Sequence, residues 1–142
     1  PLHALHTLRL PIIKRRQYVL IARDEKPIYF LSRAWLDEEA EARFLTRPSI
    51  EMREEDWQSG DRMWFCDWIA PFGDTTEMNK LMRSDFFADR CARALYHRGA
   101  ERGKRVVMFH GNNVTRKAAR HWQQTHPLAV NLPEVFKGMN NE

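Results

Sequence analysis

Residues 62–70 read RMWFCDWIA and form the most apolar stretch of this chain. Gly60 precedes the stretch and Pro71 follows it, so turn-forming residues bound a short apolar run that is rich in aromatic side chains. This pattern predicts a buried β-strand. Because side chains alternate along a strand, one face is expected to carry Arg62, Trp64, Cys66, Trp68 and Ala70, and the other Met63, Phe65, Asp67 and Ile69.

Asp67 lies in the middle of this predicted strand, among apolar neighbours. An ionised carboxylate in such a place is costly unless it is hydrogen-bonded or paired. Two interpretations follow from the residues alone. Asp67 is either a structural carboxylate that accepts hydrogen bonds within the core, or a catalytic carboxylate that orients and charges an imidazole.

Outside this strand, the hydrophobic pattern predicts a mixture of strands and helices. Strands are expected at 17–23, 28–33 and 104–110, and helices from Asp37, from 74–76 onward and at 115–124. The second helix is expected to continue far enough to point Cys91, Ala94 and Leu95 inward. Strands interleaved with helices indicate an α/β or α+β fold, a single domain with a mixed sheet flanked by helices.

Composition excludes three classes of protein. The chain has 142 residues, 43% of them hydrophobic, and no apolar run approaches the length of a membrane span. Five Trp, eight Phe and three Tyr argue against disorder, and two cysteines are too few for a disulfide scaffold. Reduced thiols without a signal peptide indicate a cytoplasmic protein. The net charge of +4 favours acidic partners without naming one.

Common site motifs do not occur in the sequence. No pair of His or Cys residues has metal-ligand spacing, so no metal site is predicted. A P-loop, a Gly-rich dinucleotide fingerprint and a serine-hydrolase elbow are also missing, so no tightly bound cofactor is predicted. Among the histidines, His97, His121 and His126 are expected at the surface and His110 in a turn.

Residues 55–74, EDWQSGDRMWFCDWIAPFGD, closely resemble the central motif of the toxin-activating lysine acyltransferases, which fatty-acylate RTX protoxins. The Gly-Asp-Arg and Asp-Trp-Ile-Ala-Pro-Phe elements are the most specific part of the match. Further matches are Leu10-Pro11, Gln17-Tyr18, Met82-Arg83 and Phe109-His110-Gly111. The resemblance implies an acyltransferase domain over residues 1–126, followed by an irregular tail over 127–142.

The resemblance also implies a GNAT-like fold and a reaction. The family takes a fatty acyl chain from acyl carrier protein and forms an amide on internal lysines of the protoxin. Its essential aspartate corresponds to Asp67, and its essential histidine corresponds best to His3, with His6 as a substitute. The histidine acts either as general base or as a nucleophile that carries the acyl group. Met63, Phe65 and Ile69 either line part of an acyl channel or belong to an ordinary core.

The family's N-terminal helix and the serine before the proline are missing from this sequence. If the missing segment completes the acyl pocket in the family, the chain as given would fold correctly without being active. An acidic carrier protein would be steered by basic residues, which are Arg83, Arg90, Arg93, Lys104, Arg105, Arg116, Lys117 and Arg120.

The alternatives are a GNAT-type acetyltransferase that uses acetyl-CoA and a non-catalytic basic binding domain. Nucleic acid is not an expected partner, and the chain acts either as a monomer or as a homodimer.

Overall fold

The computed structural model describes residues 17–73, 75–95 and 105–136. A six-stranded sheet forms its centre, and the strands follow one another across the sheet in chain order. They are β1 (Tyr18–Arg23), β2 (Lys26–Leu36), β3 (Arg62–Ile69), β4 (Cys91–Leu95), β5 (Val106–His110) and β6 (Glu134–Phe136). The order of elements and the mixed sheet confirm the predicted α+β fold class.

Strand directions are mixed. β1, β2 and β3 form an antiparallel meander, β3 and β4 are parallel, β4 and β5 are antiparallel, and β5 and β6 are parallel. The two parallel pairs need long connections, and helices supply them. The segment from 70 to 90 crosses from β3 to β4, and the segment from 111 to 133 crosses from β5 to β6.

In the part of the chain that the structure describes, three α-helices and three short helical turns surround the sheet. The α-helices are α3 (Glu38–Thr46), α4 (Thr75–Leu81) and α5 (Arg116–Thr125); the turns are η2 (Ser49–Glu51), η3 (Glu54–Trp57) and η4 (Met82–Phe86). Asp37 caps α3 by accepting a hydrogen bond from the Ala40 N–H, and Thr115 caps α5 by accepting one from the Ala118 N–H. Both caps satisfy N–H groups that a helix start leaves unpaired. Within the described residues, no helix combines the length and apolarity that crossing a membrane requires.

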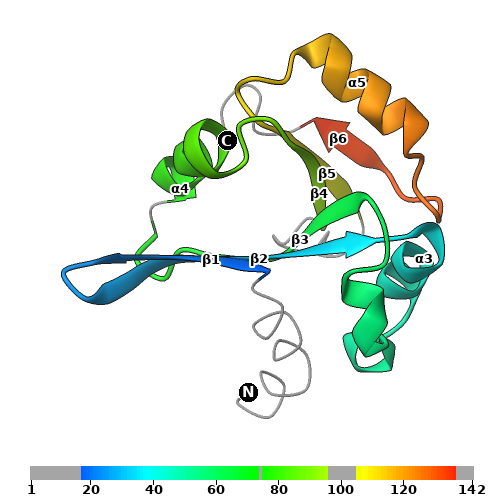
Figure 1. Cartoon of the computed structure of the whole chain (residues 1–142), viewed down its shortest axis with the longest axis horizontal. Helices are drawn as coiled ribbons and strands as arrows, with labels where there is room; N and C mark the ends of the chain where they lie inside the picture. The colour runs from blue at the N-terminus through cyan, green and yellow to red at the C-terminus, as the bar shows by residue number, and fades with distance from the viewer. Residues whose placement is uncertain (1–16, 74, 96–104, 137–142) are drawn as a thin grey trace.

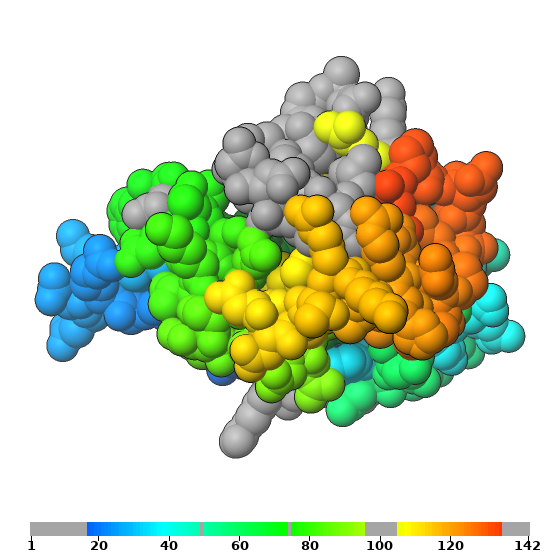
Figure 2. Space-filling model, turned by 90° about the horizontal axis from the view of Figure 1, so that it is seen from above, coloured from blue at the N-terminus to red at the C-terminus, as the bar shows by residue number. Residues whose placement is uncertain are grey.

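Two hydrophobic cores lie on opposite faces of the sheet. The first core brings Met78 and Met82 of α4 and η4 against Leu31, Met63 and Phe65. The second core brings Ala40 of α3 and Trp57 of η3 against Ala34, Leu36 and Trp64. Figure 1 shows the same division, with α4 on one side of the sheet and α3 on the other. The turn of the β1–β2 hairpin projects away from α3 and α5, as Figures 1 and 2 show.

The prediction that Cys91 to Leu95 continue a helix is wrong, because these residues form β4. α4 ends at Leu81, and one wider turn follows, in which the Phe87 N–H donates to the Met82 carbonyl. Cys91, Ala94 and Leu95 have helical spacing, but hydrogen bonding to β3 and β5 on both sides decides the outcome. Tertiary pairing here overrides local pattern.

The last segment also differs from the sequence prediction. Residues 127–142 are expected to be irregular, whereas Glu134–Phe136 form β6 beside β5. Leu128 and Leu132, from the same segment, pack against the second core. The segment after α5 therefore completes the sheet and one of its two cores.

Candidate functional site

The register between β2 and β3 shifts within the sequence motif at residues 55–74. Ser32 lies opposite Asp67, and the next residue, Arg33, lies opposite Phe65. Cys66 is therefore one extra residue on β3, which is the geometry of a β-bulge. An extra residue inverts the alternation of side chains beyond it.

The bulge corrects the predicted faces of β3. Trp68 does not share a face with Trp64; its ring packs on that of Phe65, with centroids 5.6 Å apart, against the first core. Asp67 instead lies opposite Ser32, on the face that carries Trp64 and the second core. The sequence prediction that groups Asp67 with Met63 and Phe65 is wrong for this reason.

Asp67 is held by a short hydrogen bond from the neighbouring strand. Ser32 Oγ donates to Asp67 Oδ2 over 2.6 Å. Ser32 is fully buried, whereas Asp67 is half-buried. A hydrogen bond to a carboxylate is shorter and stronger than one between neutral groups. One carboxylate oxygen is thereby fixed by a buried donor.

Asp67 also lies beyond the end of the parallel ladder between β3 and β4. That ladder pairs Trp64 with Arg93 and Phe65 with Ala94, and both pairs precede the bulge. After Ile69 the chain turns, with the Gly73 N–H donating to the Ala70 carbonyl and Gly73 at a φ of 87°. Glycine adopts this left-handed conformation without strain. The turn then leads into α4.

The predicted histidine partners, His3 and His6, lie outside the described residues. His97 lies outside them as well. The other histidines lie on β5, on α5 and at the end of α5. The ring of His110 is buried at the end of β5, with Nδ1 3.1 Å from the Gly111 carbonyl oxygen. His126 stacks on Trp122, with Nε2 3.1 Å from Asp61 Oδ2, and His121 is exposed on α5.

Sequence reasoning missed a buried carboxylate behind this site. Glu41 of α3 is fully buried and accepts three hydrogen bonds: from Trp64 Nε1 over 2.8 Å, from Arg62 Nη1 over 3.1 Å and from the Ala129 N–H over 2.8 Å. It thus ties the start of β3, four residues before Cys66, to α3 and to the segment after α5. The only sequence signal is an acidic residue beside the inward-facing Ala40.

Arg93 is the second buried charge of this cluster. Its Nε donates to Glu134 Oε2 over 2.6 Å, its Nη1 lies 3.9 Å from Glu41 Oε1, and its guanidinium lies 4.8 Å from the ring centroid of Trp122. The side chain is fully buried. Arg93 is therefore not available to steer an acidic partner, which corrects its place among the predicted docking residues.

The Gly-Asp-Arg element of the motif has a structural role. The Gly60 N–H donates to the Trp35 carbonyl, and a Cβ on Gly60 would lie 2.6 Å from Asp37 Cα. Only glycine permits this approach, which brings the start of β3 against the start of α3. Arg62 then reaches Glu41, as described above. The described residues hold no group of three His, Cys, Asp or Glu side chains that would bind a metal ion.

The sequence matches the model of a known protein family, described as HlyC, the RTX toxin acyltransferase family, over residues 1–110. It is 43% identical over 120 residues to the protein-lysine myristoyltransferase RtxC of Kingella kingae, covering 84% of this chain and 70% of the relative. It is 42% identical over 127 residues to the RTX-I toxin-activating lysine-acyltransferase ApxIC of Actinobacillus pleuropneumoniae, covering 89% of this chain and 73% of the relative.

A third relative is the leukotoxin-activating lysine-acyltransferase LtxC of Aggregatibacter actinomycetemcomitans, which is 41% identical over 123 residues, covering 86% of this chain and 72% of the relative. The matched residues include the motif at 55–74 and both sides of the β-bulge. These relatives confirm the prediction of an acyltransferase. The chain belongs to the HlyC family of RTX toxin acyltransferases.

Proposed function

We propose that this protein transfers a fatty acyl chain from acyl carrier protein to the ε-amino group of internal lysines in an RTX-type protoxin, and thereby activates the toxin. The observation that supports this most directly is Asp67, held by Ser32 at a β-bulge within the family motif and half-buried on its face of the sheet. The names of the relatives support the lysine acceptor and the toxin substrate.

The chemistry requires a base. A lysine amine has a pKa near 10.4 and is mostly protonated at neutral pH, so it must lose a proton before it attacks. We assign the base to His3, with His6 as the substitute, because an imidazole titrates near neutral pH. Asp67 then fixes the tautomer of the imidazole and stabilises the imidazolium.

In the direct route the lysine nitrogen attacks the thioester carbonyl, the C–N bond forms and the C–S bond breaks. The histidine takes the proton that the nitrogen gives up, and the thiol of the donor leaves with a proton. In the other route the histidine nitrogen first accepts the acyl group and then passes it to the lysine. Both routes place the imidazole beside the half-buried carboxylate of Asp67.

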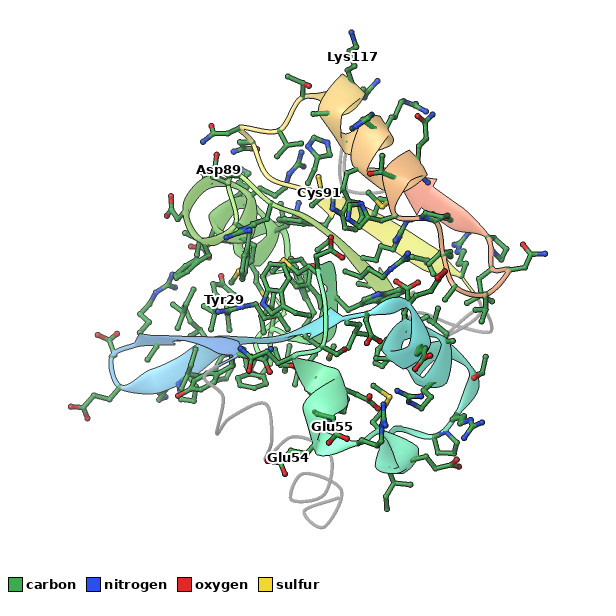
Figure 3. All side chains as sticks on the ribbon, turned by 45° about the vertical axis from the view of Figure 1, so that its right-hand side comes forward. Tyr29, Glu54, Glu55, Asp89, Cys91 and Lys117 are labelled. Atoms are coloured by element: carbon green, nitrogen blue, oxygen red, sulfur yellow. The ribbon has the colours of Figure 1, made fainter. Side chains whose placement is uncertain are left out.

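The acyl donor distinguishes this proposal from its main alternative. A conventional GNAT-type acetyltransferase would use acetyl-CoA, whereas the proposed enzyme uses acyl carrier protein. Exposed basic residues on α5, Arg116, Lys117 and Arg120, support an acidic protein as donor. Figure 3 shows Lys117 pointing away from the body of the molecule at the outer end of this helix. The exposed cluster on α5 replaces Arg93 in the proposed docking surface.

We place the reaction in the cytoplasm, where a reducing environment suits two cysteines, Cys66 and Cys91, that are not joined in a disulfide. No tightly bound cofactor is part of the proposal. Whether it works as a monomer or a homodimer does not alter the chemistry, because Asp67 and Ser32 come from one chain.

The experiment that tests the proposal is mass spectrometry of a protoxin fragment incubated with the full chain and a purified donor. We expect a fatty acyl mass on lysine with acyl carrier protein as donor, and no product with acetyl-CoA. Asp67→Ala and His3→Ala are expected to abolish the product. Full activity of a folded Asp67→Ala variant would overturn the mechanism. If His3→Ala keeps its transfer activity and His6→Ala loses it, the base is His6.

A further inference from the structure

We propose that Leu20, Phe30 and Ile69, called here the apolar row, bind the alkyl part of the fatty acyl chain while its carbonyl carbon lies at Asp67. The inference rests on the proposed function and adds a binding site to it. The three side chains come from β1, β2 and β3 in turn, because Leu20 lies opposite Phe30 and Phe30 lies opposite Ile69.

The apolar row lies next to Asp67 on the same face of the sheet. Tyr18, Ser32 and Asp67 form a parallel row across the same three strands, and each member is two residues away from a member of the apolar row. Residues two apart on a strand share a face and lie about 7 Å apart. The bulge at Cys66 produces this arrangement, because it turns Asp67 and Ile69 to the face that carries Phe30.

The apolar row is open to solvent although its members are large hydrophobic residues. Leu20 is 55% exposed and Ile69 is 42% exposed, and Phe30 is half-buried. None of the three belongs to either hydrophobic core of the described residues. Among the helices that the structure describes, α3 and η3 pack on this face near Ala34, Leu36 and Trp64, toward the end of β2 away from the hairpin turn, as Figure 1 shows for α3. An exposed apolar surface beside a reactive group is typical of a binding site.

The shape of the apolar row favours an acyl chain as its occupant. Strands lie about 4.8 Å apart, so a chain that starts at Asp67, passes Ile69 and crosses to Leu20 covers roughly 16 Å. That path matches an extended chain of the myristoyl class, which the name of the relative RtxC specifies. Tyr18 stacks on Phe30 with centroids 6.2 Å apart and supports the middle of the row.

The alternative acyl channel that the sequence suggests does not fit. Met63 and Phe65 are almost fully buried in the first core, on the opposite face from Asp67. They are ordinary core residues. Of the three residues predicted to line a channel, only Ile69 lies on the Asp67 face and has open surface.

The test measures binding without turnover. The full chain carrying Asp67→Asn is titrated calorimetrically with two soluble thioesters, S-octanoyl- and S-tetradecanoyl-N-acetylcysteamine, below their micelle concentrations. Ile69→Thr is expected to weaken both probes about five- to tenfold, since both chains pass Ile69. Leu20→Thr is expected to weaken only the tetradecanoyl probe, because the shorter chain ends before β1. Threonine keeps the strand preference at both positions.

The matched control is Ile50→Thr on η2, which removes an apolar side chain that is 68% exposed and distant in the fold. It should leave both affinities unchanged. The inference is overturned if Leu20→Thr leaves tetradecanoyl binding intact, if Ile50→Thr weakens it equally, or if Leu20→Thr and Ile69→Thr change the oligomeric state instead. Acyl transfer by Asp67→Ala would overturn the proposed function separately, since probe binding does not depend on turnover.

Discussion

Ser32 and Asp67 face one another across β2 and β3, and the Ser32 hydroxyl fixes one oxygen of the half-buried carboxylate. The pair exists because Cys66 is an extra residue on β3. If Cys66 paired with Ser32 in regular register, Asp67 would lie opposite Leu31 and its carboxylate would turn into the first core, where Met63 and Phe65 pack. The bulge therefore turns a core strand into a strand that presents a carboxylate on the opposite face.

We expect Ser32→Ala to reduce the rate of acyl transfer by about tenfold, because the Asp67 carboxylate loses the donor that orients it. A hydrogen bond to a charged group contributes about 1.5–3 kcal/mol, so the free energy of unfolding should fall by a similar amount. Mass spectrometry of the acylated fragment gives the rate, and urea unfolding gives the stability.

Ser84→Ala is the control for this prediction, since the exposed Ser84 hydroxyl donates to the Lys80 carbonyl far from Asp67. It should leave the transfer rate unchanged. A Ser32→Ala protein that transfers acyl groups at the wild-type rate would show that the hydrogen bond does not serve catalysis.

Glu41→Ala should destabilise the fold by about 3–5 kcal/mol. The substitution removes the acceptor of Trp64 Nε1, Arg62 Nη1 and the Ala129 N–H, and leaves the buried Arg93 with one carboxylate fewer. Breaking a buried ion pair on one side leaves an uncompensated charge. Urea unfolding measures the loss, and Glu38→Ala, an exposed residue in the first turn of the same helix, should lose little by comparison.

The fall in the free energy of unfolding at acidic pH should depend on Asp56. Burial alone would raise the pKa of Asp56, but hydrogen bonds from the Arg43 and Arg53 side chains and the Arg53 N–H outweigh it and lower the pKa from 3.8 to about 2. A carboxyl whose pKa is lower in the folded state stabilises the fold above its unfolded value and ceases to do so as the pH falls through the folded value.

Asp56 therefore contributes about 2 kcal/mol at pH 5 and above, and this contribution disappears between about pH 4 and pH 2. Unfolding by urea at a series of pH values should show this loss in the wild type. Asp56→Asn should remove that part of the pH dependence, and the exposed Asp85→Asn should retain it. If the free energy of unfolding falls equally between pH 4 and pH 2 in the wild type and in Asp56→Asn, Asp56 is not the group responsible.

Lys117→Glu should slow acyl transfer from acyl carrier protein by about threefold at low ionic strength, mainly through a higher KM, because it reverses a charge on the proposed docking face. The effect should shrink with added salt, since exposed charges are screened. Lys80→Glu on α4 makes the same change in net charge at another exposed site. If both variants behave alike, net charge rather than α5 determines docking.

Much of the fold follows from local sequence. The apolar run at 62–70 predicts β3, Asp37 predicts the start of α3, and the segment at 115–124 predicts α5 to within a residue. These elements have strong local signals: a bounded aromatic run and two side chains that cap helices. The motif at 55–74 likewise identifies the family without any coordinates, and it makes Asp67 the candidate site residue.

The sequence by itself determined the family of acyltransferases and singled out one aspartate of its motif, Asp67, as the candidate site residue. The tertiary structure decided which way that aspartate points, since a bulge is a property of two strands in register and one strand's sequence does not encode it. It also decided that Cys91 to Leu95 pair as a strand and that Glu41 and Arg93 are buried together. Each of these depends on partners distant in the chain, whose contacts outweigh local preference.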